Sequence, residues 1–158
     1  MKKLFISFLL LTLTLSMQSV FTDEVKRHGS FVIHSVADGD FTELAEAVKL
    51  TIEGRGLVIS YTSYPERMFK RTAKVLGDKP PVFKNAISYL FCKASTTDDL
   101  VRKDPHLLPL CPYSINVYQL TADPDVIYIS YLSPQTEAEA FKAINALINS
   151  IITEAVEF

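Results

Sequence analysis

The sequence predicts an α+β fold in which an antiparallel-rich sheet carries helices packed on one face. Two strand-like segments near the end of the chain, 114–120 and 126–132, are separated by only five residues, which predicts an antiparallel hairpin. Two further segments have the 3.6-residue apolar periodicity of helices, and each begins with a capping pattern. The predicted element order is β-α-β-α-β-α-β-β-α, which favours this fold over a doubly wound parallel sheet.

The first 22 residues have the pattern of a secretory signal peptide. Lys2 and Lys3 precede an apolar run over 4–15, and the first acidic residue is Asp23. The run is shorter than the ~20 apolar residues of a membrane-spanning helix. We therefore expect cleavage within about 16–22, no transmembrane span after cleavage, and a periplasmic or secreted protein.

The remaining residues, 23–158, are predicted to form one domain. They contain no repeat and no linker rich in glycine or serine. The formal charge of the chain is −2, and loss of the two leading lysines makes it −4, which argues against a nucleic-acid partner. Arg67, Lys70, Arg71 and Lys74 form the densest basic group; their helical spacing favours a solvated face over an anion site.

The first half of the domain alternates strands and helices. A β-branched strand is predicted over 30–36, whereas no element is assigned to the leader that contains His28. Asp40 is predicted to cap a helix whose apolar positions run from Phe41 to Ile52 and which ends at the glycines of 54–56. A strand over 57–62 follows.

The middle of the domain is punctuated by proline. Pro65 leads to a short helix over 68–76, and a strand with apolar groups on both faces is predicted over 86–92. Ser95 or Thr97 is expected to cap a short helix that ends before Pro105. The segment 106–112 is predicted to be an apolar loop.

The last helix has the strongest signal. Thr136 and Glu139 form a capping box, and the positions from Ala140 to Ala155 make a broad apolar stripe that must be buried.

Three stretches together resemble the DUF302 domain family of bacterial and archaeal proteins. They are FTELAEAVKLTIEGRGLVIS, YLFC, and DPHLLPLCPYSINVYQL continuing through VIYISYLSP. The resemblance implies a single DUF302-like domain with a compact α+β fold, often a dimer, and no established enzymatic activity. This chain has LLPLCPYSINVY where many members look like LLPCxVxVY, and Lys93-Ala94 where Asn-Pro is usual, so no ligand contact at that corner is carried over.

Cys92 and Cys111 are the only cysteines and lie 19 positions apart. In an exported protein such a pair favours a structural disulfide, and two separate buried thiols or a redox pair are the alternatives. No Cys-x-x-Cys occurs, which weakens the redox alternative.

His106 lies between the two cysteines, so Cys92, His106 and Cys111 are weak candidate ligands for a metal. Their irregular spacing favours a surface histidine instead. Noncovalent haem bound through Met68, His34 or His106 is a further alternative. The sequence predicts no metal and no cofactor.

Tyr89, Tyr113 and Tyr118, with His106, are the candidate lining of a ligand pocket, because tyrosine buries a ring while its hydroxyl stays paired. Ordinary core packing of these rings is the alternative. No nucleophile elbow, phosphate loop or dinucleotide fingerprint occurs, so no catalytic residue is predicted. The favoured function is a noncatalytic exported domain that binds a small ligand or partner protein; a thiol-redox, metal- or haem-handling protein and a structural homodimer are the alternatives.

Overall fold

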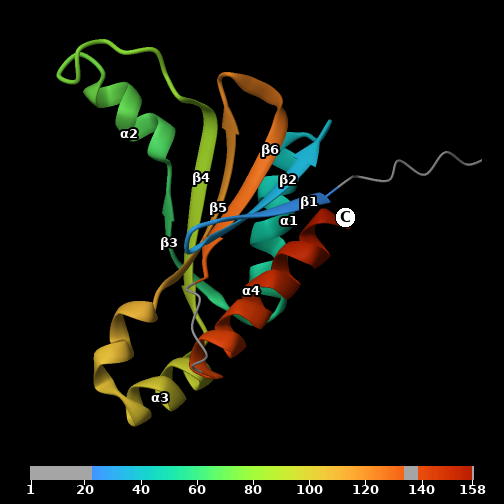
Figure 1. Ribbon diagram of the computed structural model, residues 1–158, viewed down its shortest axis with the longest axis vertical. Helices are drawn as coiled ribbons and strands as arrows, with labels where there is room; N and C mark the ends of the chain where they lie inside the picture. The colour runs from blue at the N-terminus through green and yellow to red at the C-terminus, as the bar shows by residue number, and fades with distance from the viewer. Residues whose placement is uncertain (1–22, 134–138, 158) are drawn as a thin grey trace, which may run out of the picture.

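The structure is a computed structural model that describes residues 23–133 and 139–157. Six strands form one sheet in the order β1-β2-β6-β5-β4-β3, and every neighbouring pair is antiparallel (Figure 1). The strands are β1 (Asp23–His28), β2 (Phe31–Ala37), β3 (Val58–Ser63), β4 (Phe83–Cys92), β5 (Tyr113–Leu120) and β6 (Asp123–Leu132). The predicted α+β class with an antiparallel sheet is therefore confirmed.

Two long helices cover one face of the sheet and pack against each other, while shorter helices extend beyond its two ends (Figure 1). The covering helices are α1 (Phe41–Gly54) and α4 (Glu139–Val156). At one end lies α2 (Pro65–Thr72), and at the other lie α3 (Ala94–Lys103) and the 3₁₀ helix η1 (Pro105–Leu110). None of the described helices has the length and apolar character needed to cross a bilayer.

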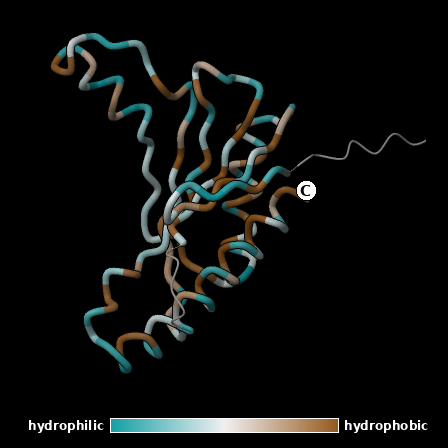
Figure 2. The backbone as a smooth tube through the Cα atoms, in the orientation of Figure 1, coloured by the Kyte–Doolittle hydropathy of each residue, from teal (hydrophilic) through white to brown (hydrophobic). Residues whose placement is uncertain are grey.

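The core lies between the sheet and the two long helices. Alternate residues of the strands are buried, as the two-residue period of a strand requires, and Ile115, Val117, Ile127 and Ile129 have no exposed surface. The apolar stripe predicted for the last helix meets them, with Ile148, Ile151 and Ile152 buried. Figure 2 shows this alternation as brown hydrophobic and teal hydrophilic residues along these elements.

The predicted cap of α1 is confirmed. The Asp40 carboxylate accepts hydrogen bonds from the backbone N–H groups of Thr42 at 2.7 Å and Glu43 at 2.9 Å, which satisfies two orphan donors of the first turn. The cap predicted for α4 depends on Thr136, which lies outside the described residues.

The leader that contains His28 is a strand rather than a segment without an element. β1 pairs with β2 from Asp23 opposite Val36 to His28 opposite Phe31, around a turn in which Gly29 has φ of +58°. Its sequence, DEVKRH, lacks strand-forming alternation, and the pairing is supported by tertiary contacts that a local pattern does not contain. Arg27, for example, donates to the backbone oxygen of Ser133 at 2.8 Å.

The three short helical elements differ in their bounds from the predictions, and β4 and β6 each begin three residues earlier than predicted. α2 begins at Pro65 and ends at Thr72, because turns occupy the residues that follow. α3 begins at Ala94 with Lys93 at the N-cap, so the predicted caps Ser95 and Thr97 were wrong: both lie inside the helix. The predicted loop over 106–112 largely forms η1, whose first turn is capped by Asp104.

Candidate functional site

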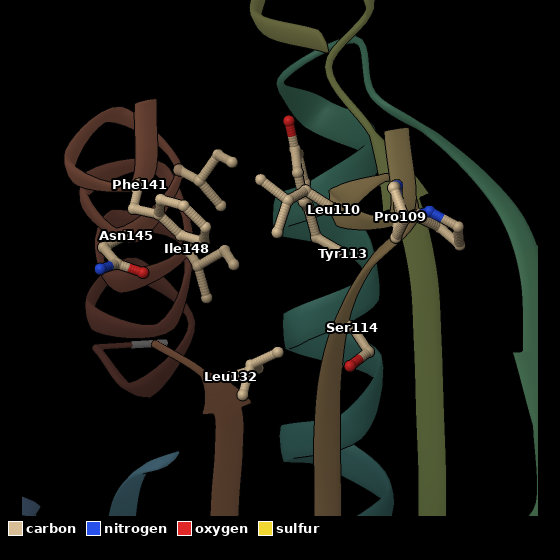
Figure 3. Close-up of a pocket in the computed structure, with 10 residues that line it drawn as sticks. Pro109, Leu110, Tyr113, Ser114, Leu132, Phe141, Asn145 and Ile148 are labelled. Atoms are coloured by element: carbon tan, nitrogen blue, oxygen red, sulfur yellow. The ribbon is translucent and has the colours of Figure 1, made fainter. Parts of the chain in front are cut away.

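A cavity of about 80 Å³ lies between η1, the start of β5 and the first turns of α4. We call it the cysteine-side pocket. In Figure 3, Phe141 and Ile148 of α4 face Leu110 and Tyr113 across it. Its lining consists of Pro109, Leu110, Pro112, Tyr113, Ser114, Leu132, Phe141, Ile144, Asn145 and Ile148.

The two cysteines position one wall of this pocket. Cys92 is the last residue of β4, and Cys111 follows η1 directly. Their sulfur atoms lie at disulfide-bonding distance and their Cα atoms are 5.7 Å apart, a usual separation for a disulfide. The structure thus supports the predicted pairing, which ties the end of β4 to the segment that carries Leu110 and Pro112.

The opposite wall is one face of α4. Phe141, Ile144, Asn145 and Ile148 recur at the three- and four-residue intervals that place side chains on one side of a helix. Asn145 is the exception in chemistry, because its Oδ1 atom is buried and accepts no hydrogen bond within the described structure. A polar group is thereby left unpaired in a mostly apolar wall.

Tyr113 lies at the inner side of the pocket. Its ring meets Phe91 edge to face at 5.9 Å, and its hydroxyl is 3.3 Å from Oγ1 of Thr97. The phenol is therefore already engaged. No ionisable acid or base other than this phenol, and no thiol, is present among the lining residues, so the chemistry on offer is binding of an apolar group, with Asn145 and Ser114 as polar contacts.

The other predicted site residues do not gather here. Tyr89 is buried under α1, where its hydroxyl donates to the carbonyl of Ala45 at 3.0 Å, and burial raises its pKa to about 12. Tyr118 lies on the opposite face of the sheet, and His106 is exposed on η1. Only Tyr113 and the segment around Cys111 come together as a candidate pocket.

The proposed weak metal set does not converge either. Within the described ranges, no group of three or more histidine, cysteine, aspartate or glutamate side chains is arranged to hold a metal ion. Cys92 and Cys111 are paired with each other, and His106 is turned toward solvent.

Tyr118 belongs to a row of aromatic rings on the sheet face that α1 and α4 leave uncovered. Its ring stacks on Tyr128 at 5.3 Å and meets Phe83 edge to face at 5.7 Å, and Phe83 stacks on Phe69 of α2 at 6.1 Å. Burial raises the pKa of Tyr118, and a hydrogen bond to Asp123 raises the pKa of Tyr128 to about 12. We call these four rings the aromatic row.

A wider, polar cleft of about 500 Å³ lies at the other end of the sheet, between the start of α1 and the β5–β6 turn. At its base Gln119 is buried and satisfied, since it accepts from Asn85 at 2.8 Å and donates to the carbonyl of Pro124 at 3.1 Å. Asp38, Asp40 and Asp125 also line it, and Asp40 is engaged as the helix cap. Gln119 thus links β4 to the β5–β6 turn beside this cleft, and its amide is already paired.

Sequence reasoning missed three of the lining residues that matter most: Leu132, Phe141 and Asn145. They lie far from Tyr113 along the chain, so no local spacing links them. One signal was available: Asn145 follows Ile144 on the flank of the apolar stripe of the last helix, where a polar residue needs a partner.

Comparison with known proteins places the fold but not the activity. No family model matches the chain, and no curated protein matches it in sequence. The crystal structure of an uncharacterized conserved DUF302 protein from Bacillus stearothermophilus superposes with a TM-score of 0.58 at 13% sequence identity. The match covers 79% of this chain and 95% of the other. The chain accordingly has a DUF302-like fold.

Proposed function

We propose that this protein is an exported, noncatalytic binding domain that takes an aliphatic group of a small ligand or a partner protein into the cysteine-side pocket. The observation that carries the proposal is the buried, unpaired Oδ1 of Asn145 in an otherwise apolar wall. The export half of the proposal rests on the signal-like pattern of the first 22 residues.

An unpaired buried acceptor is costly, by roughly 1–3 kcal/mol. A ligand that brings an N–H or O–H donor to Asn145 recovers this free energy once the amide turns its oxygen toward the cavity, whereas a purely apolar ligand does not. The pocket therefore favours an aliphatic group with a donor beside it.

The volume sets the size of that group. Pockets for whole small molecules usually measure about 300–1,000 Å³. A cavity of about 80 Å³ holds one branched aliphatic group. The rest of the ligand must lie outside, over the exposed residues Pro109 and Leu132. A leucine-like side chain with its backbone N–H, or a small amide, meets both requirements.

The test uses two probes of matched shape, N-isobutylacetamide and isobutyl acetate, of which only the first has an N–H donor. Each is titrated into the protein and followed by NMR chemical shifts. We expect shifts confined to the pocket residues, including Leu110, Tyr113 and Phe141, and about five- to tenfold tighter binding of the amide.

The Asn145→Leu variant is expected to lose the preference for the amide. Asn149→Leu is the matched control, because Asn149 lies on the same helix, one turn on, and is exposed. Shifts scattered over the surface, or an amide preference that survives in Asn145→Leu, would show that this pocket is not the binding site.

Export is tested separately by fractionating expressing cells and determining the mass of the accumulated protein. A periplasmic or secreted form whose new N-terminus falls within residues 16–23 supports it. An intact chain in the cytoplasm would contradict export while leaving the binding test unaffected.

A further inference from the structure

Residues 64–82 form an arm that extends beyond the end of the sheet opposite the cysteine-side pocket (Figure 1). The arm contains α2 and the loop that leads to β4. It holds five basic and two acidic side chains, a net charge of +3, within a chain whose formal charge is −2. The arm is thus a basic projection from an acidic body.

The helix of the arm is amphipathic. Phe69 lies on the side that faces β4 and stacks on Phe83 at 6.1 Å, although Phe69 and Met68 both stay about half exposed. The basic residues Arg67, Lys70 and Arg71 lie on the opposite side and are exposed. The positive charge is therefore directed away from the sheet.

The loop after α2 presents aliphatic side chains to solvent. Val75 is 89% exposed, Leu76 54% and Val82 65%. A turn holds the first two in place, because the backbone N–H of Leu76 donates to the carbonyl of Ala73 at 3.0 Å. Figure 2 shows apolar and polar residues alternating at this tip. Lys74 and Lys79 flank Val75 and Leu76 in the sequence, whereas Val82 lies at the base of the arm, directly before β4.

Exposed aliphatic residues that adjoin lysine and arginine in the sequence fit a surface with negative charge outside and hydrocarbon beneath. We propose that the arm docks on the surface of an anionic phospholipid bilayer, with Val75 and Leu76 entering the boundary between headgroups and acyl chains. The remainder of the chain carries a formal charge of −5, which directs the acidic body away from the same surface.

A nucleic acid would contact fewer of the exposed groups of the arm than an anionic bilayer would. Its phosphates would satisfy the basic residues, but it has no hydrocarbon layer for Val75 and Leu76. Docking also leaves the cysteine-side pocket free, because the pocket lies at the other end of the molecule. The inference therefore stands apart from the proposed ligand-binding function.

The chain contains no tryptophan, so Leu76→Trp gives a single fluorescent reporter at the tip. With vesicles of 70% phosphatidylcholine and 30% phosphatidylglycerol, we expect a blue shift of its emission and quenching by brominated acyl chains. Vesicles of phosphatidylcholine alone should give neither. Leu108→Trp is the matched control, since Leu108 is 61% exposed on η1 at the opposite end, and its emission should stay constant.

Combining Leu76→Trp with Lys70→Gln, Arg71→Gln and Lys74→Gln should weaken the response to anionic vesicles at least about tenfold. The same reporter with Lys26→Gln, Lys49→Gln and Lys142→Gln, which are outside the arm, should keep it. An equal blue shift at positions 76 and 108 would assign binding to another part of the chain, including the apolar run over 4–15. A shift that follows protein concentration without vesicles, or that appears only with nucleic acid, would also overturn the proposal.

Discussion

The two faces of the sheet are built from the same strands but differ in almost every physical respect. On the face beneath α1 and α4, Ile115, Val117 and Ile129 are excluded from water. On the other face, Asn116 alternates with them, accepts a hydrogen bond from Ser88 at 2.7 Å, and donates to the carbonyl of Ser130 at 3.2 Å. One face is held by apolar burial, and the other by polar pairs and the aromatic row.

The difference shows that the two-residue period of a strand places side chains with different roles in stability on its two faces. The covered face supplies most of the free energy of folding, since burial of apolar area is the dominant favourable contribution. The uncovered face is half-buried and combines polar pairs with aromatic rings, so we expect substitutions there to cost less. Substitutions matched across the two faces can measure how far this division holds.

The largest contrast should come from matched isoleucines. Ile129→Ala on the covered face is expected to lower the free energy of unfolding by about 2–5 kcal/mol, because it removes buried methyl groups and leaves a cavity. Ile33→Ala, on the neighbouring strand and the uncovered face, should cost about 1 kcal/mol. Urea unfolding of both variants gives the comparison, and equal losses would mean that the second face is also buried, for instance by a second copy of the chain.

The cysteine pair lies at the end of β4, away from the two matched isoleucines, and its removal should have an intermediate effect on stability. Replacing both Cys92 and Cys111 by serine is expected to cost about 3 kcal/mol in the chain-entropy description of a loop of this size. Urea unfolding measures the loss, and alkylation followed by mass spectrometry, before and after reduction, reports the state of the sulfurs. Two freely alkylated thiols in the native protein would favour the redox alternative instead.

The smallest contrast concerns two tyrosine hydroxyls. Tyr89→Phe removes a buried hydrogen bond to the carbonyl of Ala45 and should cost about 1–2 kcal/mol. Tyr118→Phe, on the uncovered face, should change stability by less than about 0.5 kcal/mol. Similar values for the two would contradict the division between the faces.

The raised pKa of Tyr89 predicts that the stability of the fold depends on pH. Burial raises the pKa of Tyr89 to about 12, whereas an unfolded tyrosine titrates near pH ~10. Between these values the folded state binds more protons, so the contribution of Tyr89 is intact below pH ~10 and is lost as the pH rises toward about 12. Stability measured across that window should fall less steeply in Tyr89→Phe than in the wild-type protein.

Much of the fold could be predicted from local patterns. The Asp40 cap, the apolar stripe of α4 and the β5–β6 hairpin each depend on residues close together in the sequence, and each was confirmed where the structure describes it. β1 could not be predicted, because its charged residues form a strand only by pairing with β2. The ends of α2 and α3 are set by the turns beside them, which helix propensity alone does not predict.

The candidate site was less accessible to sequence reasoning. Alternation along β4 correctly placed Tyr89 beside Phe91, but both faces of that strand carry apolar groups, so the pattern could not show which face the helices cover. The cysteine-side pocket joins Leu110, Leu132 and Phe141, which meet only when the chain closes. Asn145 became informative only once its buried oxygen proved to be unpaired.

The position of β2 in the sheet has a consequence for the order of assembly. Both β1–β2 and β5–β6 are hairpins of adjacent strands, but β2 joins the rest of the sheet only through β6, where Val36 lies opposite Ile127. The chain between β2 and β6 must close as one long loop before these strands can pair. This closure carries an entropic cost that pairing of adjacent strands does not. An isolated two-stranded hairpin is marginal in water, so the first strands to be synthesised gain lasting structure only after nearly the whole chain exists.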